Sequence, residues 1–166
     1  MRLILLIPLL VFILIIIISF TNIQNSNKKI NKIEPFAIYD INNDSRIDLK
    51  NEIYENKVSI IYIFSSWCSS CLINHHKISK INKNIKIYGI IWNDLRQNIQ
   101  SLLANNNPFA KVGYQNNLNQ YLKISGVPEL FLIDNKFNVI KHFKGNINIS
   151  EINKLYKTIL NNEISK

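Results

Sequence analysis

Cysteine is scarce in this sequence: among its 166 residues it occurs only at Cys68 and Cys71. A structural zinc site usually takes four protein ligands, and the sequence has neither a second Cys-x-x-Cys nor a paired Cys/His motif. His75 and His76 follow closely, so a metal site stays open as a minor alternative. A disulfide that closes so short a loop removes little entropy from the unfolded chain, which disfavours a purely structural bond. These absences favour a redox-active dithiol.

The sequence also lacks a clustered patch of one charge. It carries 20 basic and 11 acidic residues, a formal net charge of +9 at pH 7, but the basic residues are scattered along the chain. Nucleic-acid binding requires a basic patch or stripe, so we expect no nucleic-acid partner. We interpret the lysines as part of a solvated surface that is rich in lysine and asparagine.

Charge is absent from residues 3–20, a run of 18 residues dominated by isoleucine and leucine. This length reaches the lower limit for a helix that spans a bilayer. A cleavable signal peptide is the alternative, but residues 19–23 offer no small-residue cleavage site. We therefore expect a single-pass signal anchor over residues 1–20, with residues 3–20 in the membrane.

The rest of the chain divides into a tether and one domain. Residues 21–33 are polar, rich in asparagine and lysine, and typical of a flexible tether. Residues 34–166 are enough for one domain with its own core. Positive charges flank the anchor on both sides, so their count alone leaves its orientation open. We place the domain on the extracytoplasmic side, partly because of the resemblance described below.

The two cysteines lie at the junction of an expected strand and an expected helix. The apolar, β-branched run Val58–Phe64 predicts a buried strand, and isoleucines recur at helical spacing after the cysteines. The free N–H groups at a helix N-terminus stabilise a thiolate, so Cys68 is the predicted nucleophile. Cys71, one turn later, is the predicted resolving thiol, which attacks a mixed disulfide formed by Cys68. Cys68 and Cys71 are thus the candidate catalytic pair and the candidate redox-active disulfide.

Hydrophobic patterning along residues 34–166 predicts alternating strands and helices that end in a hairpin and a helix. This order is typical of an α/β sandwich, in which helices flank a mixed central sheet. Asn93-Asp94 and Ser150 are expected to cap the helices that follow them. The expected strands are residues 36–39, 46–49, 58–64, 85–92, 109–112, 130–134 and 139–143, and the expected helices are residues 68–82, 95–104, 116–123 and 150–160.

Two motifs and the segment between them resemble a known family. Residues 64–71 read Phe-Ser-Ser-Trp-Cys-Ser-Ser-Cys, with His75 behind them, and residues 126–134 read Gly-Val-Pro-Glu-Leu-Phe-Leu-Ile-Asp. Residues 89–97 and 107–109 match the family's middle segment in order and spacing. On these motifs the chain resembles the thioredoxin-like, membrane-anchored thiol:disulfide interchange proteins of cytochrome c maturation, the CcmG/DsbE type.

The resemblance implies a thioredoxin-like sandwich, and four residues are expected to support its dithiol. The Val127–Pro128 peptide bond is cis in such folds, which leaves the Val127 backbone facing the dithiol and able to pair with an extended substrate. Trp67 is expected to shield the dithiol and to offer partners an apolar contact, with core packing as the alternative. Glu129 is expected to act as an acid near the thiols, with an exposed glutamate at a strand start as the alternative.

The resemblance also implies a thiol:disulfide oxidoreductase that reduces disulfides on the periplasmic side of the cytoplasmic membrane. The implied target is the Cys-x-x-Cys-His segment of apocytochrome c, or a cytochrome c maturation factor. Electrons arrive from a transmembrane thiol transporter of the DsbD/CcdA kind. No organic cofactor and no metal are expected, because the protein's own dithiol is the redox centre.

Three features depart from the family's pattern. Ser69 and Ser70 stand where the family usually has Pro and a small polar residue, which leaves the reduction potential open. Asn74 replaces an acidic residue, and Tyr62 stands where thioredoxin itself carries a buried acid. Three alternatives remain: a ResA/TlpA-type reductase with other targets, a copper-binding assembly chaperone that uses both thiolates and a histidine, and an interaction domain with an idle dithiol.

Overall fold

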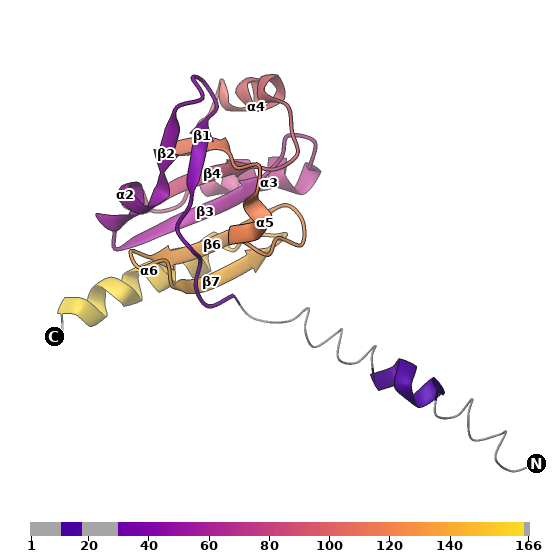
Figure 1. Ribbon diagram of the computed structural model, residues 1–166. Coiled ribbons are helices and arrows are strands. Elements are labelled where there is room, and N and C mark those ends of the chain that lie inside the picture. Colours follow the sequence, from indigo (N-terminus) through magenta and orange to yellow (C-terminus); the bar gives the residue numbers. More distant parts are fainter. Residues whose placement is uncertain (1–10, 18–29, 165–166) are drawn as a thin grey trace, which may run out of the picture. The chain divides into compact units, whose positions relative to one another are not determined.

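Figure 1 shows the computed structural model, which describes residues 11–17 and 30–164. Residues 11–17 are helical and belong to the first of two compact units, residues 1–30. The second unit, residues 31–166, contains all elements discussed below. Most of the expected anchor and tether lies outside the described residues. Among the residues that the structure does describe, no helix combines the length and the apolar character needed to cross a bilayer.

The second unit is built on one mixed sheet with helices packed against it. Its strands are β1 (Ala37–Asp40), β2 (Arg46–Asp48), β3 (Val58–Phe64), β4 (Lys86–Ile91), β5 (Lys111–Tyr114), β6 (Glu129–Asp134) and β7 (Val139–Lys144). Its helices are α2 (Leu49–Tyr54), α3 (Ser69–Ile78), α4 (Arg96–Leu103), α5 (Leu118–Tyr121) and α6 (Ile149–Ile164). The strands lie in the order β2-β1-β5-β4-β3-β6-β7. Only β3–β4 and β4–β5 are parallel neighbours among the strands described, which confirms the expected mixed sheet.

β3 is an inner strand because its sequence is apolar on both faces. All seven of its residues are buried, and it pairs with β4 on one side and with β6 on the other. A strand covered on both faces requires near-continuous apolar side chains rather than alternation. Its last residue, Phe64, leads directly into the segment that carries the two cysteines.

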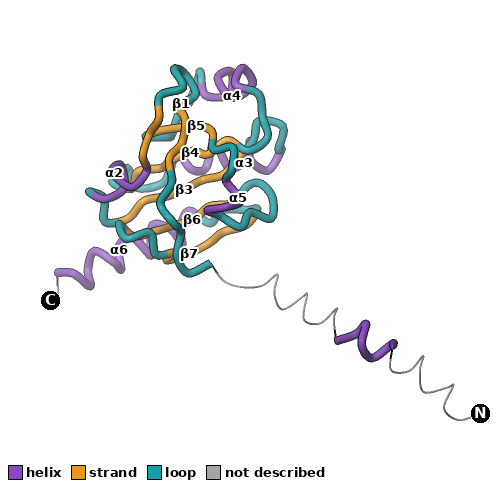
Figure 2. Tube along the Cα trace, in the orientation of Figure 1, coloured by secondary structure: helices purple, strands orange, loops and turns teal. Residues whose placement is uncertain are grey.

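The dithiol belongs to the sheet face that α3 and α6 cover. Side chains alternate across a strand, so Tyr62 and Phe64 point to the opposite face from Ile61 and Ile63. Tyr62 and Phe64 share a buried cluster with both cysteines and with side chains of α3 and α6. Figures 1 and 2 show α3 and α6 behind the sheet and α5 in front of it. The core thus extends from β3 up to the sulfur atoms.

The bounds of several elements, β5 and α5 among them, differ by a few residues from the sequence-based expectation, and two segments differ in kind. The strand predicted to include Leu49 ends at Asp48, whose carboxylate accepts a hydrogen bond from the Lys50 N–H at 3.0 Å and caps α2, a helix that was not predicted. The start of the domain also differs. Ile33, expected in the tether, is fully buried, and its N–H donates to the Phe137 carbonyl at 2.9 Å. Residues 31–33 therefore belong to the second unit.

Candidate active site

Cys68 stands at the N-terminal end of α3, as its N-cap residue. Its sulfur accepts a hydrogen bond from the Cys71 N–H at 3.2 Å and lies 3.3 Å from the Ser70 hydroxyl oxygen. Cys68 and Cys71 are joined by a disulfide, and their Cα atoms lie 5.2 Å apart. When this bond is reduced, the N–H groups and the dipole at this helix end stabilise a thiolate on Cys68.

Trp67 lies at the surface immediately before the dithiol. The residue is 59% exposed, whereas Cys68 is 7% exposed and Cys71 only 2%. The Trp67 Nε1–H donates to the Asn93 carbonyl at 2.9 Å, which fixes the ring beside the dithiol. Core packing, the alternative reading of Trp67, is therefore wrong. The indole instead leaves an apolar surface exposed next to Cys68.

Asp94 fastens the active-site loop to the segment after β4. Its carboxylate accepts hydrogen bonds from the backbone N–H of Ser66 and, at 2.7 Å, from that of Leu95. Burial alone would raise the pKa of Asp94, but these hydrogen bonds outweigh burial and lower the pKa below its ordinary value. Leu95 occupies the N-cap position of α4, so the predicted Asn93-Asp94 cap is wrong. The Asp94 carboxylate instead stabilises the loop that precedes the cysteines, through its hydrogen bond with the Ser66 N–H.

Pro128 brings a second segment of chain against the dithiol. The Val127–Pro128 peptide bond is cis, as the family resemblance implies. The Val127 carbonyl oxygen lies 3.6 Å from the Cys68 sulfur. The Pro128 carbonyl accepts a hydrogen bond from the Gly145 N–H at 2.9 Å. The Val127 carbonyl therefore faces the dithiol.

Glu129 is buried, with only 2% of the residue exposed, so the exposed alternative is wrong. One carboxylate oxygen accepts hydrogen bonds from the Ser125 N–H and hydroxyl, both at 2.7 Å, and from the Gly126 N–H at 3.2 Å. Burial alone would raise the pKa of Glu129, but hydrogen bonds from His142 and Ser125 outweigh burial and lower it. The carboxylate thus holds the loop that leads into Pro128.

His142 is the partner that sequence reasoning missed. Its Nε2 lies 2.7 Å from the second carboxylate oxygen of Glu129, and its ring stacks on Phe131 with a centroid distance of 4.0 Å. Residues 129 and 142 sit on the adjacent strands β6 and β7. The only signal in the sequence is a histidine within an otherwise ordinary strand pattern, which does not identify its partner.

Asn74 and His75 lie on the buried face of α3, behind the cysteines. The Asn74 amide donates to the Gly145 carbonyl at 2.8 Å, so this residue links α3 to the segment after β7. His75 Nε2 lies 2.8 Å from the Asn106 carbonyl oxygen. Within residues 11–17 and 30–164, no group of three or more His, Cys, Asp and Glu side chains is placed to hold a metal ion.

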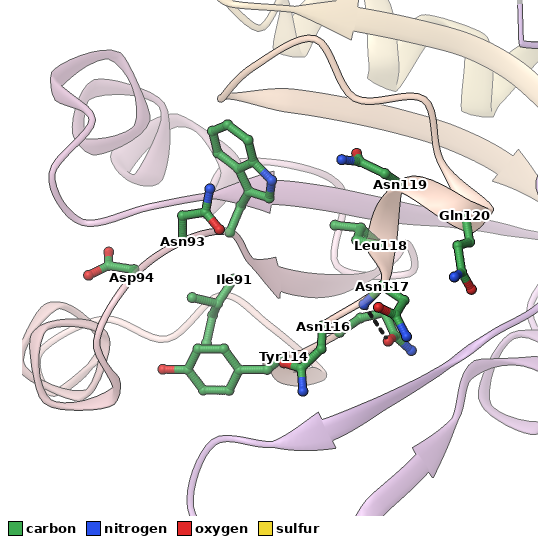
Figure 3. Close-up of a pocket in the computed structure, with 11 residues that line it drawn as sticks. Ile91, Asn93, Asp94, Tyr114, Asn116, Asn117, Leu118, Asn119 and Gln120 are labelled. Carbon is green, nitrogen blue, oxygen red and sulfur yellow. Dashed lines mark hydrogen bonds between the residues drawn. The ribbon is translucent and has the colours of Figure 1, made fainter.

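A pocket of about 520 Å³ adjoins this site (Figure 3). Trp92, Asn93 and Asp94 form one side of it, and these residues also contact the loop that carries Trp67. The opposite side consists mainly of amide side chains from the end of β5 and from α5, which include Gln115, Asn116, Asn117, Asn119 and Gln120. Amides both donate and accept hydrogen bonds, so this lining matches the polar groups of a peptide backbone.

No protein-family model matches the chain. Over 113 residues the chain is 24% identical to the thiol:disulfide interchange protein HelX of Rhodobacter capsulatus, a match that covers 66% of this chain and 64% of HelX. Over 148 residues it is 27% identical to the thiol:disulfide interchange protein DsbE of Allochromatium vinosum, which covers 82% of this chain and 81% of DsbE. Both relatives are thus named for disulfide exchange.

The structure resembles the crystal structure of a thiol:disulfide interchange protein of the thioredoxin family from Chlorobium tepidum. The TM-score is 0.65 at 18% identity, and the match covers 81% of this chain and 99% of that chain. This likeness establishes the thioredoxin-like fold. The fold agrees with the curated relatives and with the position of the Cys-x-x-Cys pair at the start of α3. These findings together support a thioredoxin-like thiol:disulfide oxidoreductase that is similar to the interchange proteins DsbE and HelX.

Proposed function

We propose that this chain is a membrane-tethered disulfide reductase of cytochrome c maturation, with its second unit on the extracytoplasmic side of the cytoplasmic membrane. Its target is the Cys-x-x-Cys-His segment of apocytochrome c, or a maturation factor that handles this segment. Relatives named for disulfide interchange support the exchange reaction, and the uncharged run at residues 3–20 supports the tether. The observation that carries the proposal is the Cys68 sulfur at the start of α3, 3.6 Å from the Val127 carbonyl oxygen.

Exchange then proceeds in two steps. In the reduced protein the Cys68 thiolate attacks one sulfur of the target disulfide, and the other target sulfur leaves as a thiolate. Cys71 next attacks the Cys68 sulfur of this mixed disulfide, the target leaves reduced, and the Cys68–Cys71 disulfide forms. Cys71 is 2% exposed, so burial prevents it from reacting with an external disulfide first. The order of the two cysteines is thereby fixed.

The surroundings of Cys68 favour a polypeptide over a small thiol as the target. An extended peptide that pairs with the Val127 backbone places its own cysteine near the Cys68 sulfur. The exposed indole of Trp67 supplies an apolar contact beside that cysteine, and aromatic groups of this kind are enriched at interfaces. Residues of the target that lie beyond its cysteine are able to bind in the amide-lined pocket of Figure 3.

Each turnover consumes two electrons, and the extracytoplasmic compartment is oxidising, so the dithiol requires a dedicated donor. A transmembrane thiol transporter of the DsbD/CcdA kind supplies them by the same exchange chemistry run in the opposite direction. The tether raises the local concentration of the domain near such membrane partners. Neither an organic cofactor nor a metal takes part in any of these steps.

The substitution Cys71→Ser tests the proposal because it removes the resolving thiol and retains the nucleophile. We expect the reduced full-length variant to form a covalent complex with an oxidised Cys-x-x-Cys-His peptide, visible on a non-reducing gel and released by dithiothreitol. The double variant Cys68→Ser/Cys71→Ser is the control and forms no complex.

Two results would count against the proposal. If no complex forms although iodoacetamide alkylates Cys68 at neutral pH, the exchange scheme is wrong. If an unrelated disulfide peptide is trapped at the same rate, the protein is a reductase of broader specificity, as in the ResA/TlpA alternative.

A further inference from the structure

The imidazole of His75 has one nitrogen that the fold leaves without a hydrogen bond. Its Nε2 lies 2.8 Å from the Asn106 carbonyl oxygen, and a carbonyl oxygen can only accept, so Nε2 carries the hydrogen. Nδ1 is therefore a bare acceptor in the neutral ring. The residue is 3% exposed, and Nδ1 has no partner among the described residues. Buried polar atoms without a partner are rare in folded proteins, so this one requires an explanation.

The position of His75 on α3 supplies that explanation. It follows Cys71 by four residues, and both lie on the buried face of the helix. Side chains four apart on a helix have Cβ atoms about 5–6 Å from each other. Helical side chains lean toward the helix N-terminus, so a side chain at position 75 covers the side of the helix where Cys71 lies. The Cys71 sulfur is bonded to Cys68 here and carries no hydrogen. In the reduced protein it carries one, and the Cys71 thiol is then able to donate to an acceptor on the same face of α3.

We propose that His75 is the general base for Cys71 in the resolving step. This assignment rests on the proposed function and deepens it. His75 Nδ1 takes the proton from the Cys71 thiol as the Cys71 sulfur attacks the Cys68 sulfur of the mixed disulfide. The Cys68–Cys71 bond forms, the bond between Cys68 and the target sulfur breaks, and the target leaves as a thiolate. That thiolate takes up a proton from solvent, and the imidazolium later returns its proton to solvent, so atoms and electrons balance.

The groups around the ring are consistent with a neutral base. Phe109 and Asn106, which pack against the ring from the segment between α4 and β5, carry no charge. Burial lowers the pKa of His75. The hydrogen bond to Asn106 acts in the opposite direction and His76 contributes a smaller lowering, so the net shift of the pKa is downward. The ring is therefore unprotonated at neutral pH and ready to accept. Tyr62, in the same buried cluster as Cys71, is no substitute, because burial raises the pKa of its hydroxyl.

The substitution His75→Gln separates the base from the structural hydrogen bond. The glutamine amide N–H takes the place of Nε2–H toward the Asn106 carbonyl, but no acceptor remains at the position of Nδ1. Reduced full-length protein is mixed with an oxidised Cys-x-x-Cys-His peptide, and the mixed disulfide is quantified by acid quench and mass spectrometry. We expect the mixed disulfide to form at the wild-type rate and to resolve about 100-fold more slowly at pH 7, the lower end for a positioned base.

The pH profile and a matched control sharpen this test. The defect is expected to shrink as the pH rises toward about 8.5, the ordinary pKa of a thiol, since Cys71 then ionises without a base. His76→Gln makes the same chemical change on the exposed side of α3 and is expected to leave both steps unchanged. Resolution of the mixed disulfide at the wild-type rate in His75→Gln would overturn the assignment, as would an unchanged pH profile.

A measurement on the unsubstituted protein makes the test independent of how the variant folds. In histidine-labelled full-length protein, the ¹⁵N resonance of His75 Nδ1 is expected to shift on reduction, because it gains a hydrogen bond from Cys71. The resonances of His76 are expected to stay in place. An unmoved His75 Nδ1 resonance would overturn the proposal. If Cys71→Ser traps a complex while His75 shows none of these effects, only the base assignment fails and the proposed function stands.

Discussion

Single buried polar residues fix the backbone segments that surround the dithiol. Asn74 ties α3 to the carbonyl of Gly145, and Glu129 ties the strand β6 to the loop at Ser125. Burying a polar group is costly unless it is hydrogen-bonded, so each of these side chains favours one arrangement of its loop. The arrangement that results leaves the Val127 carbonyl beside the Cys68 sulfur. The geometry of the reacting atoms therefore depends on residues that do not themselves react.

Glu129→Ala tests this dependence at one residue. The change leaves the N–H groups of Ser125 and Gly126 and the ring of His142 without their shared acceptor. We expect the free energy of unfolding to fall by about 3 kcal/mol, since removing the acceptor leaves buried hydrogen-bond donors unsatisfied. Urea denaturation of the oxidised protein measures the loss.

The exposed pair Lys141–Glu151 provides the matched control for this prediction. Its nitrogen and oxygen lie 2.9 Å apart, but both side chains are more than one third exposed. Glu151→Ala is expected to change the free energy of unfolding by no more than about 0.5 kcal/mol, as is usual for surface ion pairs. Losses of equal size in the two variants would contradict the role assigned to Glu129.

Among the elements, β5 shows how closely the strands of this sheet approach. It lies between β4 and β1, and Gly113 pairs with Asp40 in the antiparallel β1–β5 ladder. A methyl group added at Gly113 would overlap the carbonyl oxygen of Tyr39, a backbone atom that cannot rotate away. The absence of a side chain at this position is therefore a condition for joining the β1–β2 hairpin to the rest of the sheet.

Gly113→Ala is expected to lower the free energy of unfolding by about 3 kcal/mol, at the upper end for overpacking of a folded interior, because the two strands must separate. Gly126→Ala is the control, since a methyl group there meets no atom within 4 Å. We expect Gly126→Ala to leave the free energy of unfolding unchanged. Thermal and urea unfolding of both variants measure the difference, and equal stability of the two proteins would refute the steric argument.

The sequence predicted elements well where burial imposes a continuous pattern. The apolar run predicted β3 with its observed bounds, Val58–Phe64. The hydrophobic pattern of the sequence did not predict α2, because a helix of six residues with only Leu49 and Ile53 buried has no sustained helical periodicity. It also misplaced the cap of α6: the Asn148 side chain, rather than Ser150, accepts the Glu151 N–H at 3.1 Å. In a sequence rich in asparagine, many residues are capable of capping.

In the candidate site, too, the sequence predicted contacts between residues close in the chain and did not predict contacts between distant ones. Trp67, Cys68 and Cys71 lie in one segment, so their spacing alone predicted the dithiol and its helix. The contact of Glu129 with His142 depends on the register of β6 with β7, which shifts between Leu132 and Ile133. Such an irregularity changes which face each later residue occupies, so alternation in the sequence does not predict the pair.

In the second unit as a whole, the topology of the sheet assembles the site at one edge. β3 and β4 run in parallel, so their carboxyl ends deliver the cysteine loop and the segment from Trp92 to Leu95 to the same place. β6 runs antiparallel to β3, and its first residue pairs with Ile63, which brings the Val127–Pro128 bond to that edge. Loops at the carboxyl ends of parallel strands are the usual position of sites in open α/β sheets.

The free energy of unfolding of the whole unit is expected to fall in acid, and Glu129 accounts for part of the fall. Burial alone would raise the pKa of Glu129, but its hydrogen bonds lower it below the ordinary 4.5. The folded state thus binds this proton more weakly than the unfolded state, so the stabilisation is complete above pH 4.5 and lost as the pH falls through the folded pKa.

Urea unfolding at a series of pH values between about 6 and 3 measures how steeply the free energy of unfolding changes with pH. The glutamine of Glu129→Gln does not titrate in this range, so the free energy of unfolding of the variant is expected to fall less steeply with decreasing pH. The difference in free energy of unfolding between the variant and the unsubstituted protein is therefore expected to become smaller in acid. Parallel curves for the two proteins would show that the folded and unfolded states bind the Glu129 proton equally, contrary to its buried hydrogen bonds.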